Sequence, residues 1–264
     1  MCPSRFALLL VFALASQYTF ARQTPSPPTV PPPQRNTQAV TIVQQSVTAM
    51  AATVPSDSSA TGTVKVVEGS TNQSGSIQIL TLGTSNTSET LTLPGTQRVV
   101  IYSNGTAEET NGTQSTNPPM ETVVTDQCPD FPLPLLLSAL NNPDESLSYI
   151  GQETLNGESV QHVQVWDSFT SQPYLQKLAP FSQEDIWFDS SSGLPVKLSY
   201  FRRAGGGSVP SIPVAVFFSN YTNINGVLYP FQINKSFNGT PSQTITIQNV
   251  TFNNGLTAAQ FPVE

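Results

Sequence analysis

Short runs of alternating apolar and polar residues occupy most of the chain after residue 62. In the first half the side chains alternate with period two, which is typical of strands that have one face buried. Gly69, Gly75, Gly83 and the pair Pro94-Gly95 separate the runs. These runs predict a meander of about four antiparallel strands joined by hairpins, over residues 63–67, 76–82, 89–93 and 97–102.

The same alternation returns in the second half and continues to the end of the chain. Turn dipeptides lie in the breaks, namely Asn156-Gly157, Ser192-Gly193, Asn225-Gly226 and Asn238-Gly239. We expect seven strands there, over residues 147–153, 160–166, 186–188, 196–201, 214–221, 229–234 and 242–252. Roughly eleven strands with one or two helices predict an α+β fold, built on one large antiparallel sheet.

One helix is predicted over residues 37–52. Asn36 is a suitable N-cap and Pro55 follows the end. Val40, Val43, Val47 and Met50 recur at spacings of three and four and make a narrow apolar stripe. Valine and threonine have poor helix propensity, so this helix should depend on packing its stripe against the sheet.

A second helix is predicted over residues 132–140, which are rich in leucine and include Pro134. This segment is too apolar to lie fully exposed. Either it plugs the concave side of the sheet or it packs as an ordinary core helix, and we favour the core helix because apolar helices usually complete cores.

The amino terminus has the pattern of a secretory signal peptide. Arg5 precedes an apolar run over residues 6–15, and small residues follow, so we place cleavage after Ala21, with Ala15 as the alternative. The run is half the length that a membrane span needs, so we expect a periplasmic or secreted protein that is not an integral membrane protein. An uncleaved amino-terminal anchor is the alternative interpretation of residues 1–21.

Residues 22–35 predict a disordered spacer, because six prolines lie between positions 24 and 33 and favour extended chain. A docking peptide is the less favoured interpretation.

Removal of residues 1–21 leaves Cys128 as the single cysteine, so an intramolecular disulfide is excluded and the core must hold the fold. We expect a monomer. The net charge of −7 and a charged fraction of 10% exclude the basic footprint of a nucleic-acid-binding protein.

Catalytic chemistry finds little support in the sequence. His162 is the single histidine, and it lies in a predicted strand without a nucleophile-elbow motif. Glu184 with Asp185 and Asp189 suggests paired carboxylates, although strand ends are often acidic because they are solvated. We therefore predict that the protein is not an enzyme and uses no cofactor; two carboxylates converging in a polar cleft would favour a hydrolase instead.

Metal and phosphate sites are also disfavoured. One histidine and one cysteine cannot build a zinc site, and the acidic residues 126, 130, 144 and 145 lack the spacing of a calcium loop. Glycines 205–207 lack the lysine and helix of a phosphate-binding loop and indicate a hairpin tip. Arg202 and Arg203 form the densest positive charge, which we interpret as a solvated loop rather than a contact for an anionic headgroup.

Aromatic residues are frequent in the second half, at Trp166, Trp187, Phe188, Phe217, Phe218 and Phe231. Neighbours in a strand face opposite sides of a sheet, so one set should fill the core and the other is left for a concave ligand site or the surface. The core is the default position for both tryptophans.

The carboxy-terminal half has an order of motifs that resembles the LolA and LolB-like superfamily of bacterial envelope proteins. The order is Ile186-Trp187-Phe188-Asp189, then residues 192–197 (SGLPVK), the strand from Val214, residues 225–231 (NGVLYPF) and a closing strand from Ile245. With the helix that precedes residues 60–64, the resemblance covers most of residues 36–264.

The resemblance implies a strongly curved, incomplete antiparallel barrel whose open side is covered by helices and receives lipoprotein acyl chains or other apolar ligands. On this basis residues 36–264 form one LolA-like half-barrel domain with an apolar-ligand site, and an envelope protein is its expected partner. The candidates for lining it are Leu136, Leu140, Trp166, Trp187 and Phe217. The competing hypothesis is a structural or protein-interaction module whose concavity is filled by side chains.

Overall fold

One thirteen-stranded sheet dominates the computed structural model, which describes residues 33–124, 130–202 and 212–263. Every strand pairing in the sheet is antiparallel, and the order is β6-β5-β4-β3-β2-β1-β13-β12-β11-β10-β9-β8-β7. The first group of strands is β1 (Asp57–Glu68), β2 (Thr71–Leu82), β3 (Asn86–Leu93), β4 (Thr96–Ser103), β5 (Thr106–Asn111) and β6 (Gln114–Thr116). The second is β7 (Glu145–Leu155), β8 (Glu158–Asp167), β9 (Glu184–Asp189), β10 (Pro195–Arg202), β11 (Ile212–Ile224), β12 (Val227–Phe237) and β13 (Thr240–Phe252).

The α+β fold with a large antiparallel sheet is confirmed, and all eleven predicted strands are present. The two additional strands, β5 and β6, have the sequences TAEETN and QST. They contain almost no apolar residues, so no alternation marked them in the sequence. They continue the meander beyond β4 and leave β6 as one edge of the sheet.

Asparagine-glycine turns join several of the hairpins, as predicted. Asn104, Asn156, Asn225 and Asn238 all have positive φ, and so do the glycines that follow them. Positive φ at both central residues is the requirement of the tight turn that matches the twist of the strands. These dipeptides therefore fix where each hairpin reverses.

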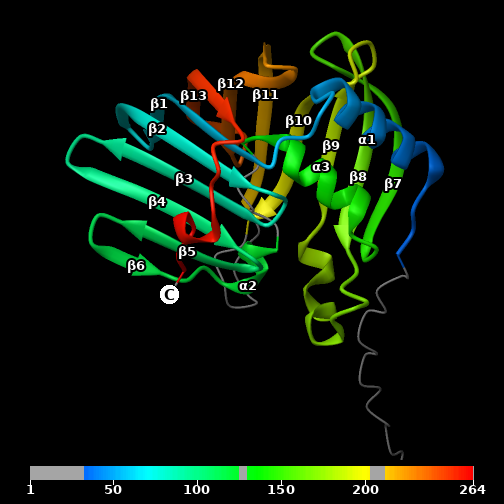
Figure 1. Ribbon diagram of the computed structural model, residues 1–264, viewed down its shortest axis with the longest axis horizontal. Coiled ribbons are helices and arrows are strands. Elements are labelled where there is room, and N and C mark those ends of the chain that lie inside the picture. The colour runs from blue at the N-terminus through cyan, green and yellow to red at the C-terminus, as the bar shows by residue number, and fades with distance from the viewer. Residues whose placement is uncertain (1–32, 125–129, 203–211, 264) are drawn as a thin grey trace, which may run out of the picture.

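The sheet is strongly curved and open (Figure 1). Residues 58–66 of β1 pair with β13, which brings the first and last strands together at the centre of the sheet. A bulge lies between Thr61 and Gly62 in this pairing, and such bulges increase local twist. Among the described residues no pairing joins β6 to β7, so the barrel is incomplete as predicted.

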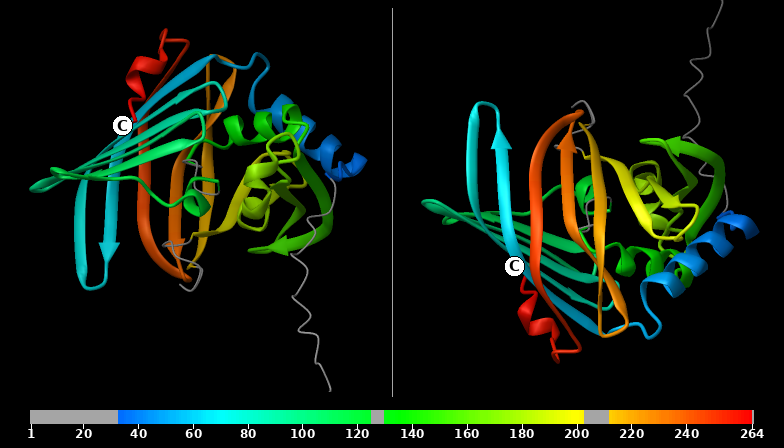
Figure 2. Two further views of the ribbon diagram at one scale, coloured as in Figure 1. Left: turned by 90° about the horizontal axis from the view of Figure 1, so that it is seen from below. Right: turned by 90° about the horizontal axis from the view of Figure 1, so that it is seen from above.

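Two helices lie within the bend of the sheet, against the half that contains β7 to β10 (Figure 2). The first, α1 (Thr37–Met50), is capped by the Asn36 side chain, which accepts a hydrogen bond from the amide of Ala39. Its buried stripe is Ala39, Val43, Ser46 and Met50. The predicted stripe shared only Val43 and Met50 with it, because the helix turns the small residues Ala39 and Ser46 inward and leaves Val40 and Val47 half-buried.

The second helix, α3 (Pro132–Asn141), packs as a core helix on the concave side. Leu133 and Leu136 are buried completely, and they join a single large core with residues of α1 and of both halves of the sheet. Three short helices were not predicted, namely α2 (Met120–Val123), the 3₁₀ segment η1 (Pro173–Phe181) and the 3₁₀ segment η2 (Ala258–Gln260).

The residues just before α1 belong to the folded domain. The Asn36 amide donates to the Leu147 carbonyl at 2.9 Å, and the Leu147 amide donates to the Gln34 carbonyl at 2.7 Å. The last residues of the predicted spacer thus pair with β7. The predicted signal peptide, most of the spacer, Asp126, Cys128, Arg203 and glycines 205–207 lie outside the described residues. Within the described part, no helix has the length and apolar character to span a membrane.

Candidate functional site

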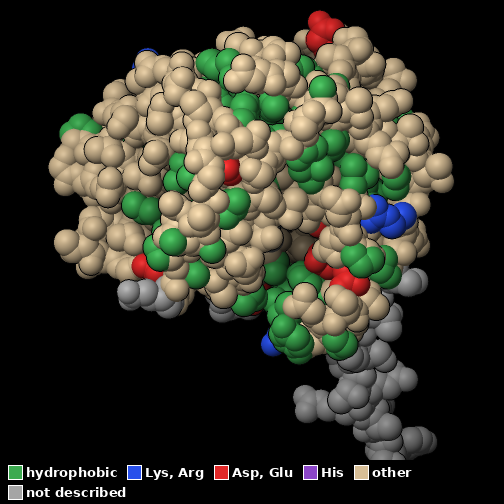
Figure 3. Space-filling view, in the orientation of Figure 1, with side chains coloured by type: hydrophobic (Ala, Val, Ile, Leu, Met, Phe, Trp, Pro, Cys, Tyr) green, Lys and Arg blue, Asp and Glu red, His purple; other side chains and the backbone are tan. Residues whose placement is uncertain are grey.

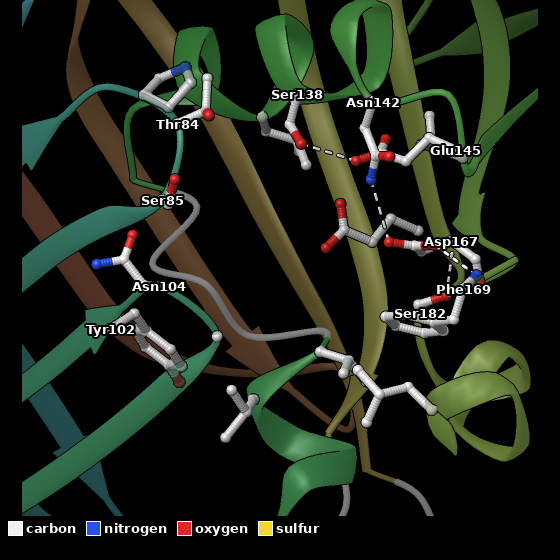
Figure 4. Close-up of a pocket in the computed structure, with 18 of the residues that line it drawn as sticks. Thr84, Ser85, Tyr102, Asn104, Ser138, Asn142, Glu145, Asp167, Phe169 and Ser182 are labelled. Carbon is white, nitrogen blue, oxygen red and sulfur yellow. Dashed lines mark hydrogen bonds between the residues drawn. The ribbon is translucent and has the colours of Figure 1, made fainter. Parts of the chain in front are cut away.

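A cleft of about 460 Å³ lies between the ends of β3 to β5 on one side and α3, β7, β8 and η1 on the other. Figure 3 shows a hollow in the surface where acidic and hydrophobic side chains gather. Figure 4 shows Tyr102 and Asn104 on one wall, and Glu145 and Asp167 on the other. The cleft lies beside α3, and α2 and η1 also border it.

One part of the cleft is apolar. Met120, Val123 and Val124 approach from α2 and its C-cap, Pro134 and Leu135 from α3, and Leu175 from η1. The other apolar lining residues are Phe131, Val165, Trp166 and Phe169. Phe169, Leu178 and Ala179 form a small separate core, against which Trp166 and Leu175 pack. This part of the cleft can accept an aliphatic chain.

Three carboxyl groups line the other part, and each comes from the same end of an adjacent strand. Glu145 opens β7, Asp167 ends β8 and Glu184 opens β9. The register places Glu145 opposite Asp167, and Glu184 opposite Val165. Sequence analysis grouped Glu184 with Asp185 and Asp189, and it did not bring these three acids together.

Glu145 is a deeply buried acid with one unsatisfied oxygen. The residue is 8% exposed. Its Oε1 accepts a hydrogen bond from Ser138 at 2.8 Å, shown by a dashed line in Figure 4. Its Oε2 is buried and has no hydrogen-bond partner among the described residues. Burial is the main cause that raises the pKa of Glu145 to about 7, and the neighbouring Asp167 charge adds to it.

Asp167 is held by two donors. The Phe169 amide donates to its Oδ1 at 2.7 Å and the Asn142 side chain donates to its Oδ2 at 3.2 Å. Burial raises the pKa of Asp167 despite these bonds, and Asp144 contributes a like charge. Carboxyl groups with raised pKa values in a cleft are typical of functional sites.

Basic side chains are absent from the lining of this cleft, as far as the described residues show. Arg35 lies behind it and donates to the backbone carbonyls of Leu140, Asn142 and Glu145, at 2.8, 3.1 and 3.2 Å. Its guanidinium thereby caps the end of α3. The electrostatic character of the cleft is therefore set by its acids.

A second cavity of about 450 Å³ lies farther along the concave face and shares Tyr102 with the cleft. Its charged residues are paired: Lys235 contacts Glu89 at 2.7 Å and Asp130 at 2.8 Å, and Arg202 pairs with Glu109. Burial would raise the pKa of Glu89, but the Lys235 ammonium holds it down at about 2. Burial raises the pKa of Asp130 well above its usual value, and the neighbouring Glu89 charge adds to it.

The sequence-predicted lining residues are divided between three places. Trp166 lines the cleft and is half-buried. Leu136 is completely buried in the main core, and Leu140 is half-buried against it. Neither leucine reaches the cleft, because the face of α3 that carries Pro134, Leu135 and Ser138 is the one that lines it.

Trp187 and Phe217 lie on the outer face of the sheet, where they alternate with buried neighbours. The His162 ring stacks on Trp187 with a centroid distance of 4.3 Å, and the Lys197 ammonium lies 3.8 Å from the centroid of the Trp187 ring. The expectation that both tryptophans fill the core is therefore wrong. Trp187 is held by cross-strand polar and aromatic contacts on the surface instead.

His162 contacts a carboxylate at each ring nitrogen. Nδ1 lies 2.7 Å from Glu153 and Nε2 lies 2.9 Å from Asp185. Both nitrogens are thus occupied, which agrees with the interpretation of His162 as a structural residue on a polar face. Within the described residues, no group of three or more His, Cys, Asp or Glu side chains has the geometry of a metal site.

No protein-family model and no curated protein sequence matches the chain. Solved structures do match it, each over 85% of the chain. A proposed outer membrane lipoprotein-sorting protein domain from Vibrio parahaemolyticus has 13% identity, 96% of its length covered and a TM-score of 0.56. A LolA superfamily protein from Nitrosomonas europaea has 11% identity, 97% of its length covered and a TM-score of 0.56. A DUF1329 family protein from Desulfovibrio piger has 12% identity, 97% of its length covered and a TM-score of 0.53. The chain therefore has the LolA-like fold, as the order of motifs in its second half predicted.

Proposed function

We propose that this protein binds an amphiphilic ligand with an apolar chain, in the periplasm or outside the cell, and that the cleft between α3 and the ends of β3 to β5 holds that ligand. The observation that carries the proposal is the cleft itself, which has an apolar part and an acidic part within about 460 Å³. This volume falls in the ordinary range of small-molecule sites, roughly 300–1,000 Å³.

Burial of the apolar chain would provide the driving force, at about 25 cal/mol for each Å² removed from water before the costs of binding. The fold supports a lipid or a lipoprotein acyl chain as the ligand, because the similar Vibrio domain is described as a lipoprotein-sorting protein. Fold alone does not fix function, so the proposal depends on the cleft.

The position of the ligand differs from the one expected from the sequence. The space beneath α1 and α3 is occupied by core side chains, including Leu136. We therefore assign the ligand to the cleft beside α3. Trp166 stays in the proposed site, and Leu135 and Leu175 join it.

A protein-interaction module is the second candidate, and the filled core beneath the helices favours it. In that case the cleft would be a surface irregularity that holds only water. The two functions differ in one measurable property, which is whether an apolar molecule occupies the cleft with defined stoichiometry.

A two-carboxylate hydrolase receives less support than either the ligand-binding protein or the interaction module. Of the three acids that the sequence grouped, Glu184 lines the cleft whereas Asp185 contacts His162 on the outer face. Glu145 and Asp167 do converge, and the raised pKa of Glu145 would suit the general acid of such a mechanism, so a hydrolase is kept as the third candidate. We propose a binding role without catalysis.

Native mass spectrometry of protein purified from a bacterial envelope tests the proposal, with a delipidated sample as control. We expect a stoichiometric acyl-bearing species that rebinds after removal. Leu175→Ala should weaken rebinding, whereas Tyr174→Ala should not, because Leu175 lines the cleft and the neighbouring Tyr174 is 74% exposed. A lipid-free protein that rebinds nothing would favour the interaction module.

A further inference from the structure

We infer that the cleft selects amphiphiles whose head is a positively charged amine, and that the unsatisfied oxygen of Glu145 and the Asp167 carboxylate receive that amine. This inference depends on the proposed function, because it names the head group of the ligand whose apolar chain the cleft is proposed to bind.

The charge of the lining gives the first argument. Glu145, Asp167 and Glu184 all line the cleft, and none of the described lining residues is lysine, arginine or histidine. An anionic head, such as a fatty-acid carboxylate or a lipid phosphate, would enter a site that offers it only like charge. A cationic head would meet complementary charge in a partly buried site, where screening by salt is weak.

The hydrogen bonding of Glu145 gives a second, independent argument. Buried polar atoms in proteins nearly always have a partner, and an orphaned one requires an explanation. Glu145 is 8% exposed and its Oε2 has no partner among the described residues, although Oε1 is satisfied by Ser138. Figure 4 shows this side chain reaching inward beneath α3. An ammonium group carries three donors and can satisfy the orphaned oxygen and an Asp167 oxygen together.

The arrangement of polar and apolar groups fits the same ligand. Asp167 lies in the chain directly after Trp166, which lines the cleft, and Phe169 follows two residues later. Aromatic rings beside carboxylates favour cations, because the ring face attracts positive charge. The apolar lining from α2 and η1 then accepts the chain attached to the amine.

The second cavity gives a contrast within the same protein. There Lys235 and Arg202 are both paired with acids of their own, so that cavity is close to neutral. The cleft instead has acids without lining cations, among the residues that the structure describes. Selectivity for an amine therefore belongs to the cleft and not to the concave face as a whole.

A series of ligands with one chain length tests the inference. Dodecylamine, dodecanol and dodecanoate differ only in the charge of the head, and their binding to the purified protein is measured by calorimetry below their aggregation concentrations. We expect dodecylamine to bind about tenfold or more tightly than dodecanol, and dodecanoate to bind most weakly, since a hydrogen bond to a charged group is one of the stronger single contacts.

Near-isosteric variants locate the effect. Glu145→Gln and Asp167→Asn should each reduce the preference for dodecylamine over dodecanol several-fold. Glu158→Gln is the matched control, because it removes one negative charge at an exposed position on β8, away from the cleft. A preference that survives both cleft variants would overturn the assignment to these residues.

The outcomes separate the two proposals. Equal binding of the three ligands overturns the selection of an amine and leaves the proposed function in place. A preference for dodecanoate has the same two consequences. Failure of all three ligands to bind overturns the proposed function and this inference with it. The comparison among ligands uses the unmodified protein, so it stays decisive if a variant does not fold.

Discussion

Glu145→Gln should make the protein less sensitive to pH. The raised pKa of Glu145, about 7 against an ordinary value of 4.5, means that the folded state keeps a proton that the unfolded state releases. Ionisation of the unfolded chain then favours unfolding. The stability associated with this group is fully present below pH 4.5 and is lost as the pH rises toward 7.

The size of the effect follows from the two pKa values. Between pH 5 and pH 8 the linkage relation gives a loss of about 2.5 kcal/mol in the free energy of unfolding. Glutamine has the same shape and cannot ionise, so the variant should not show this loss. The groups around Glu145 are Ser138, Asn142, Asp167 and Arg35, and they remain in the variant.

Urea unfolding of both proteins at pH 5 and pH 8 measures the effect. The stability of the variant relative to the unmodified protein should improve by about 2.5 kcal/mol from the lower to the higher pH. Glu158→Gln, at an exposed position, should show no such change. A difference that is the same at both pH values would refute the description of Glu145 as a buried acid that keeps its proton.

Three further substitutions test the packing of the sheet by thermal or urea unfolding. Lys235→Met should lower the free energy of unfolding by about 3–5 kcal/mol, because it leaves two buried carboxyl groups without their cation. Lys65→Met, at an exposed position, should change it little. Gly62→Ala should cost about 1–3 kcal/mol, since a Cβ at the bulge would lie 2.2 Å from the Thr246 carbonyl oxygen. Asp57→Asn should cost about 1–3 kcal/mol and loosen the loop after β13, because the buried Asp57 carboxylate accepts three backbone amides of that loop, at 2.7, 3.0 and 3.3 Å. Wild-type stability in any of these would contradict the corresponding contact.

Strand and turn positions were predictable because one face of each strand is buried and the turns need special backbone conformations. The pattern in β1 alternates buried and exposed residues along most of its length, and Asn156 and Asn225 both adopt the positive φ that their turns require. β5 escaped prediction because its sequence, TAEETN, has only one apolar residue. The face of α1 was misjudged because Ala39 and Ser46 are among its buried residues, and small residues do not stand out in an apolar stripe.

The acidic cleft escaped prediction for a different physical reason, which is the register of one hairpin. Counting back from the two-residue turn Asn156-Gly157 places Glu145 opposite Ser168. A bulge between Tyr149 and Gly151 shifts the pairing by one residue and brings Asp167 opposite Glu145. A one-residue shift moves side chains to the other face of a sheet, so the convergence of these acids depends on the bulge. Gly151 was the available signal, since a lone glycine inside an alternating strand indicates a bulge. The feature on which the proposed selectivity depends is therefore encoded in a local irregularity of the strand and not in any motif of acidic residues.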